Sequence, residues 1–153
     1  MKRKVCELLE EKGSEIYTID VGKNLKDATK MFIEMNIGAL IVVNIKGEIQ
    51  GIISERDIIR KLAKTDNAIN EMSVEEVMTP HDKLVIGNPD DDIQYIMKVM
   101  TTNRIRHILI ICSEGECKTE GLISIGDVIK ALLTDLDYEN KMLKDYIEGS
   151  YPV

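Results

Sequence analysis

The twelve residues GIISERDIIRKL at positions 51–62 decide the fold, because a close copy, GLISIGDVIKAL, stands at positions 121–132. Six of the twelve positions are identical, and three of the other six are conservative exchanges. The match extends towards the N-terminus of each copy, where NIGALIVV at 36–43 corresponds to RIRHILII at 104–111. The segments that open the two copies also correspond, VCELL at 5–9 and VEEVM at 74–78. The period of about 69 residues is longer than that of solenoid repeats, so the pattern indicates one duplicated unit.

The duplication predicts the organisation of the chain. The expected divisions are a first copy at 1–64, a linker at 65–72, a second copy at 73–133 and a C-terminal helix with its tail at 134–153. Neither copy is long enough to bury a sizeable core alone. We therefore expect the two copies to pack face to face about a pseudo-twofold axis.

Each copy predicts the same order of elements: helix, strand, helix, strand, strand, helix. A first strand is expected at 16–19 and at 84–86, followed by a helix with apolar residues at about 3.6-residue spacing, as at positions 25, 28, 32 and 35. Two further strands are expected at 39–45 with 49–53 and at 107–112 with 120–124, joined by turns at 46–47 and 113–116. The predicted fold is mixed α/β (α+β), with tandem repeats that are each a small mixed sheet flanked by helices.

The composition disfavours several classes of protein. Acidic residues outnumber basic ones by 27 to 20, a net charge of −7, which makes nucleic acid an unlikely partner because its phosphates need a basic surface. No apolar run approaches the roughly 18 residues of a membrane-spanning helix, so no membrane partner is expected. The irregular spacing of Cys6, Cys112 and Cys117 argues against disulfides or a metal site and favours the reducing cytoplasm.

The duplicated Ser-x-x-Asp motif, Ser54 to Asp57 and Ser124 to Asp127, has two interpretations that both stay open. In the first it is a helix cap, with the serine hydroxyl accepting a first-turn N–H and the aspartate placed well for the helix dipole. In the second the same free N–H groups, hydroxyl and carboxylate form a ligand site, because an aspartate accepts two hydrogen bonds from a vicinal diol such as that of ribose.

Basic residues differ between the copies. Arg106 and His107 begin a predicted strand of copy two, where copy one has Gly38 and Ala39. Arg56 stands inside the first motif, where the second has Gly126. If the copies face each other, Asp57 and Arg56 would meet Arg106 and His107 across one cleft. The sequence thus predicts two inequivalent sites, with the Asp57 site better suited to a phosphate-rich ligand, although a solvated strand end is an equal alternative for the basic pair.

These paired motifs resemble CBS (cystathionine β-synthase) domains, and the chain is similar to small stand-alone prokaryotic proteins made of one CBS pair, or Bateman module. The resemblance covers residues 4–136 and implies clefts between the copies that bind adenine-containing ligands: AMP, ADP, ATP, NAD or S-adenosylmethionine. AMP, ATP or NAD is favoured, as a regulatory ligand and not as a catalytic cofactor. The resemblance also implies a homodimer.

By the family pattern, ribose hydroxyls would bind to the two aspartates, and ribose or phosphate would lie near the two serines. Backbone and apolar groups at the strand starts would frame the adenine. The implied ligand-binding residues are Thr18, Ile37, Gly38, Ala39, Ser54, Arg56, Asp57, Ile86, Ile105, Arg106, His107, Ser124, Gly126 and Asp127.

The expected function is that of a regulatory or sensory module. The alternative is a protein-interaction or oligomerisation module with degenerate ligand sites, and it leaves room for an unidentified regulated protein. An enzyme is not expected, because no nucleophile stands at a suggestive spacing from a base and no glycine-rich phosphate loop is present. The helix from 134 onwards is interpreted as a solvated face, or else as a docking surface with Leu136, Met142, Leu143 and Tyr146 as contacts.

Overall fold

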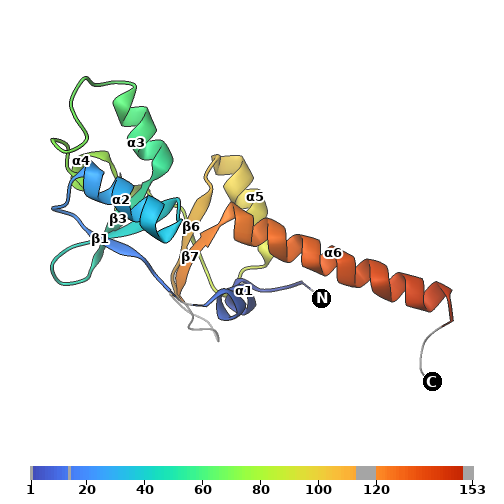
Figure 1. The fold of residues 1–153 in the computed structure, drawn as a ribbon. Helices are drawn as coiled ribbons and strands as arrows, with labels where there is room; N and C mark the ends of the chain where they lie inside the picture. The colour runs from blue at the N-terminus through green and yellow to red at the C-terminus, as the bar shows by residue number, and fades with distance from the viewer. Residues whose placement is uncertain (1, 14, 113–119, 150–153) are drawn as a thin grey trace. The chain divides into compact units, whose positions relative to one another are not determined.

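The chain divides into two structural units, and the bounds of these units differ from the bounds of the two sequence repeats (Figure 1). The first-repeat unit comprises residues 15–85, and the second-repeat unit comprises residues 1–14 together with 86–153. The computed structural model describes residues 2–13, 15–112 and 120–149, so the predicted turn at 113–116 and Cys117 lie outside the described residues. Both units combine a small sheet with helices, which confirms the predicted mixed α/β fold.

The first-repeat unit holds a four-stranded sheet in the order β1-β2-β3-β4. Its elements are β1 (Thr18–Asp20), α2 (Leu25–Met35), β2 (Ala39–Val43), β3 (Ile49–Ser54), α3 (Glu55–Leu62), α4 (Val74–Val77), β4 (Thr79–Pro80) and the 3-10 turn η1 (His81–Lys83). Strand β1 runs parallel to β2, whereas β3 is antiparallel to both of its neighbours. The parallel pair needs a crossover, which α2 provides.

Helix α2 contributes one apolar face to the core of this unit. Leu25, Ala28 and Phe32 lie on one face of the helix and are buried in a cluster with strand residues such as Leu40 and Ile53. Met35 was predicted to share that face, but it is 44% exposed. It is the last residue of the helix, and the next residue turns the chain towards β2 in the left-handed conformation, so Met35 extends past the core.

The second-repeat unit holds a three-stranded sheet in the order β5-β6-β7. Its elements are α1 (Val5–Lys12), β5 (Ile86–Gly87), α5 (Ile93–Asn103), β6 (His107–Ile110), β7 (Gly121–Ser124) and α6 (Ile125–Ile147). Strand β5 is parallel to β6, and β6 is antiparallel to β7, as in the corresponding part of the other sheet. The core is again apolar, with Ile96, Met100 and Ile108 almost completely buried.

A lead-in segment precedes the first strand of each copy: residues 2–13 for copy one and residues 72–80 for copy two. These two lead-in segments are exchanged between the two units. The Val5 amide donates to Asp91 O at 2.9 Å, and the Ile93 amide donates to Arg3 O at 3.0 Å. The equivalent pairs in the other unit are Val74 N to Lys23 O at 2.8 Å and Leu25 N to Met72 O at 2.9 Å. Each lead-in segment is therefore part of the unit formed by the other repeat.

Several predicted boundaries differ from the structure. The first strands were expected at 16–19 and 84–86, but β1 and β5 begin two residues later, where pairing with β2 and β6 starts. The segment 65–72, expected to be a linker, adds Met72 to the buried core of the first-repeat unit. The helix expected from residue 134 is the continuation of α6, which runs for 23 residues.

Of the helices in the described ranges, none combines the length and apolar character that crossing a bilayer requires.

The equivalent glycines Gly51 and Gly121 provide a matched test of the packing. A methyl group at Gly51 would overlap the carbonyl oxygen of Thr79 in the neighbouring strand, whereas at Gly121 it would meet the flexible Leu9 side chain at 3.0 Å. We expect Gly51→Ala to lower the free energy of unfolding by about 2–3 kcal/mol and Gly121→Ala by less than about 1 kcal/mol. Urea denaturation measures both, and equal losses would contradict the β3–β4 register.

Candidate functional site

The first Ser-x-x-Asp motif lies where β3 ends and α3 begins. The Ser54 amide and hydroxyl donate to Oδ2 of Asp57 at 2.8 and 2.9 Å. In return, the Asp57 amide donates to the Ser54 hydroxyl at 3.4 Å. The motif is thus a reciprocal helix cap, which confirms the first interpretation, and the cap also holds the carboxylate in one orientation.

The second motif repeats this geometry between β7 and α6. The amide and hydroxyl of Ser124 each donate to Oδ2 of Asp127 at 2.8 Å, and the Asp127 amide donates to the Ser124 hydroxyl at 3.2 Å. Both aspartates are partly buried at the amino-terminal end of a helix. A carboxylate in this position is favoured by the helix dipole and stays available as an acceptor.

Each motif lies beside the strand start of its own repeat. Ala39 pairs with Ser54 across the sheet, and the Glu55 amide donates to Gly38 O at 3.1 Å. In the other unit His107 pairs with Ser124, and the Ile125 amide donates to Arg106 O at 2.8 Å.

The remaining predicted residues surround these pairs. Ile37 and Ile105 immediately precede the strand starts and are partly buried, while Thr18 and Ile86 lie on the adjacent parallel strands, paired with Ile41 and Leu109. Arg56 and Gly126 are exposed in the first turns of α3 and α6. Every predicted residue therefore falls in one of two half-sites, defined as the motif and strand starts within one unit. The predicted meeting of Asp57 with Arg106 and His107 joins residues of different units and stays a prediction.

Lys12 is a site residue that sequence reasoning missed. Its ammonium group donates to Oδ2 of Asp127 at 2.6 Å and to Leu122 O at 3.0 Å. It stands in the last turn of α1, which precedes copy one in the sequence but belongs to the second-repeat unit. No pattern in the sequence indicates that exchange, so no signal could have brought Lys12 to Asp127.

The charges of the second half-site also differ from expectation. Burial lowers the pKa of His107 to about 4, and the positive charges of Arg106 and Lys12 act in the same direction against the opposing effect of Asp127. His107 is therefore neutral at pH 7, and its assignment as half of a basic pair was wrong. Arg106, immediately before β6, is exposed.

Asp127 is held in its ionised form. Burial alone would raise its pKa, but hydrogen bonds from Lys12 and from Ser124, with the Lys12 charge, outweigh burial and hold the pKa below its ordinary value. Among the residues that the structure describes, no cation forms an ion pair with Asp57. The first half-site thus presents a carboxylate bound only to its own cap, and the second presents a carboxylate already paired with a cation.

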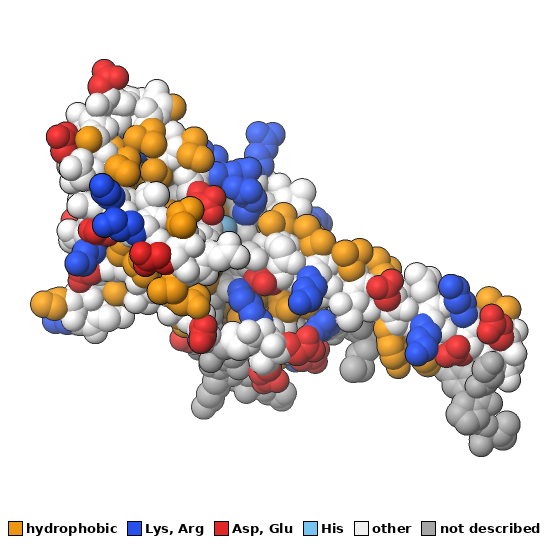
Figure 2. Space-filling model, in the orientation of Figure 1, with side chains coloured by type: hydrophobic (Ala, Val, Ile, Leu, Met, Phe, Trp, Pro, Cys, Tyr) orange, Lys and Arg blue, Asp and Glu red, His pale blue; other side chains and the backbone are white. Residues whose placement is uncertain are grey.

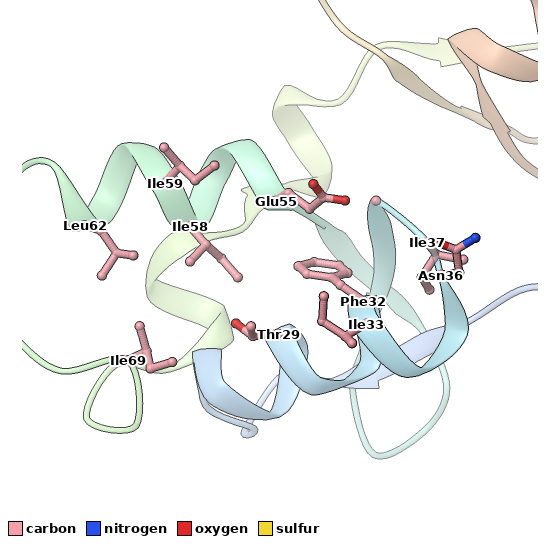
Figure 3. A pocket seen from close by; sticks show the side chains of 11 residues that line it. Thr29, Phe32, Ile33, Asn36, Ile37, Glu55, Ile58, Ile59, Leu62 and Ile69 are labelled. Atoms are coloured by element: carbon pink, nitrogen blue, oxygen red, sulfur yellow. The ribbon is translucent and has the colours of Figure 1, made fainter.

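The first-repeat unit also contains an apolar groove, with a volume of about 640 Å³, between α2 and α3 (Figure 3). Phe32, Ile58 and Leu62 are among its lining residues, and Ile33 and Ile59 are 79% and 64% exposed. Ser54 and Asp57 do not line the groove, whereas Ile37 and Gly38 of the first half-site do. Within the described ranges, no cluster of three or more histidine, cysteine, aspartate or glutamate residues is arranged to hold a metal ion.

The family model of the CBS domain matches residues 8–64 and 74–134, the two segments that carry these half-sites. The chain belongs to the CBS domain family. A mitochondrial CBS domain-containing protein of Arabidopsis thaliana is 39% identical over 128 residues, which are 82% of this chain and 60% of that protein. The chain therefore spans only part of the length of this relative.

Solved CBS-pair structures share the fold. A CBS-domain containing protein from Agrobacterium tumefaciens is 31% identical, with a TM-score of 0.75, and the match covers 86% of this chain and 94% of that one. The CBS domain pair of protein MJ0100 is 21% identical, with a TM-score of 0.71 over 88% of this chain and 99% of that one. That pair was crystallised in complex with 5′-methylthioadenosine and S-adenosyl-L-methionine.

The lowered pKa of His107 predicts a pH dependence of stability. Between pH 6.5 and about 4 the unfolded chain protonates this histidine and the folded chain does not, so the free energy of unfolding falls as the pH drops. The loss attributable to His107 is on the order of 3 kcal/mol. Chemical denaturation between pH 6.5 and 4 should show that His107→Gln removes this part of the change in the free energy of unfolding with pH.

The control is His81→Gln, the same exchange at an exposed histidine, which tests whether removing any histidine alters the slope. Asp127 affects stability in a lower pH range than His107. Because its pKa is depressed, its contribution to the free energy of unfolding is lost only as the pH falls below about 4. An unchanged slope in His107→Gln between pH 6.5 and 4 would contradict the buried, neutral state of this histidine.

Proposed function

We propose that this chain is a regulatory module that binds adenosyl ligands at its two Ser-x-x-Asp half-sites. One observation carries the proposal: both hydrogen bonds from Ser54 go to Oδ2 of Asp57. In the part of the chain that the structure describes, no group hydrogen-bonds to the other oxygen, Oδ1. The cap therefore fixes a carboxylate and leaves one of its oxygens for a ligand.

The groups of this half-site support the proposed ligand class. A ribose offers two adjacent hydroxyl donors, which suit a fixed carboxylate. The partly buried Ile37 and the backbone of Gly38 and Ala39 offer an apolar surface and peptide groups to an adenine ring. The complex of the MJ0100 pair with 5′-methylthioadenosine and S-adenosyl-L-methionine supports an adenosyl ligand, and AMP, ATP and NAD carry the same adenosine group.

The role proposed is binding and not catalysis, and membership of the CBS domain family supports it. A ligand regulates only if it binds two conformational states with different affinity. We further propose the cytoplasm as the compartment, because the irregular spacing of the three cysteines in the sequence suits a reducing environment.

A second candidate function is an oligomerisation module, and the apolar groove between α2 and α3 favours it. The groove is lined mainly by isoleucine, leucine and phenylalanine, and its rim residues Ile33 and Ile59 are exposed. Exposed apolar surface of this kind commonly marks a protein interface. We propose a second copy of this chain as the occupant, in keeping with the expected homodimer.

Removing the Asp57 carboxylate tests the first function. We expect Asp57→Ala to weaken binding of the preferred ligand at the first half-site at least roughly tenfold, because the ribose hydroxyls lose their acceptor. Isothermal titration with AMP, ATP, NAD and S-adenosylmethionine measures this, and Asp57→Asn, which keeps an oxygen acceptor for the cap, separates binding from folding. Asp66→Ala, an exposed carboxylate in the same unit, is the control.

Two outcomes would overturn the sensor proposal. One is a wild-type chain that binds none of the four ligands, which would leave the oligomerisation module. The other is a ligand that binds the double variant Asp57→Ala/Asp127→Ala as tightly as the wild type.

Lys12 predicts a charge preference at the second half-site. A fixed ammonium favours anionic phosphates over the cationic sulfonium of S-adenosylmethionine. In a chain that already carries Asp57→Ala, we expect Lys12→Met to shift the affinity ratio of ATP to S-adenosylmethionine roughly tenfold towards the sulfonium. The exposed Lys26→Met should leave the ratio unchanged, and an unchanged ratio in Lys12→Met would exclude Lys12 from the site.

A further inference from the structure

Helix α6 carries a second apolar stripe in addition to the one that faces its own unit. The stripe residues alternate at spacings of four and three along the helix: Ile129, Leu133, Leu136, Asn140, Leu143 and Ile147. Its apolar members are between 43% and 80% exposed, and Asn140 is exposed as well. An alternation of four and three is the a/d pattern of a coiled coil, with Leu133, Asn140 and Ile147 at a positions.

This stripe lies beside the packing face of α6 within its unit, and its residue Leu136 also lines a shallow pocket with Arg3 and Asp135. Val128 and Ala131 are buried on the packing face, and Asp135 forms an ion pair with Arg3 at 3.5 Å. Figure 2 shows hydrophobic side chains at the surface along this helix. The fold of the unit therefore leaves the stripe open to another chain.

We propose that the α6 helices of two copies of this chain form a parallel, two-stranded coiled coil through this stripe. The interface is isologous, because the same residues of each copy meet about a twofold axis. The proposal goes beyond ligand binding and needs no nucleotide.

Asn140 favours a second copy as the occupant. In a parallel, in-register pair it meets Asn140 of the partner subunit, and the two side-chain amides can hydrogen-bond to each other. A single asparagine at an a position is a known device for setting register and two-stranded assembly. In an antiparallel pair with the same seam, Asn140 would instead face the partner's Leu136 and leave its amide without a polar partner.

The flanking charges select the same orientation. Glu139 occupies a g position and Lys144 an e position, so a parallel pair places Glu139 beside the partner's Lys144, twice by symmetry. An antiparallel pair would place Asp137 near the partner's Asp137 and Glu139 near the partner's Glu139. Of the parallel pair and the antiparallel pair in which Asn140 faces the partner's Leu136, only the parallel pair brings opposite charges together, which gives the stripe charge complementarity to itself.

The seam can be tested with one core and one outer-face variant. Leu143 and Tyr138 are similarly exposed, at 60% and 65%, but only Leu143 is at a seam position. In sedimentation equilibrium of the full chain without nucleotide, we expect a wild-type dimer, at least roughly tenfold weaker association for Leu143→Arg, and no change for Tyr138→Arg. A monomeric wild type, or a dimer that Leu143→Arg does not weaken, would overturn the proposal and point to another partner or another face.

A charge exchange tests the orientation. We expect Glu139→Lys alone to weaken the dimer roughly tenfold, because two attractive pairs become repulsive, and the added change Lys144→Glu to restore it. The two residues are five apart and so do not form a helical i to i+3 or i+4 pair within one chain. Rescue therefore reports a contact between chains, and a double variant as weak as Glu139→Lys would contradict the parallel coil. Because these measurements contain no nucleotide, their outcome is separate from that of the ligand titrations.

Discussion

Backbone hydrogen bonds attach each lead-in segment to the repeat that it does not precede, and the other features of the two units follow from this attachment. Val74 donates to Lys23 in one unit and Val5 donates to Asp91 in the other. The bonds satisfy backbone groups at the start of α4 and α1, which would otherwise need water or a side chain. The exchange brings Lys12 to Asp127, and it makes the two half-sites electrostatically different although their caps are alike.

The cap and the proposed ligand site use the same atoms without conflict. Oδ2 of each aspartate accepts the hydrogen bonds from the serine, and this fixes the direction of Oδ1. A site built on a rigid helix start needs little reordering when a ligand binds, which lowers the entropic cost of binding. The interpretation as a cap, which the geometry confirms, is therefore the physical basis of the proposed function.

Local patterns predicted most of the fold, and long-range contacts decided what they missed. The capping boxes at Ser54, Ser73 and Ser124 were predictable because a cap depends on four consecutive residues. The starts of β1 and β5 depend on pairing with strands elsewhere in the chain. The neutral state of His107 depends first on burial, then on the neighbouring Arg106 and on Lys12, which lies 95 residues away in the sequence. Strand pairing, burial and the approach of Lys12 are not visible in local sequence.

The most direct test of adenosyl binding at the half-sites is a set of ¹H–¹⁵N correlation spectra of the full chain during titration with AMP, ATP, NAD or S-adenosylmethionine. At least one ligand should shift the amide signals of residues 54–57 or 124–127 together with those of the strand starts at 37–39 or 105–107. Shifts confined to the apolar groove around Ile33 and Ile59, or none with any of the four ligands, would contradict the account.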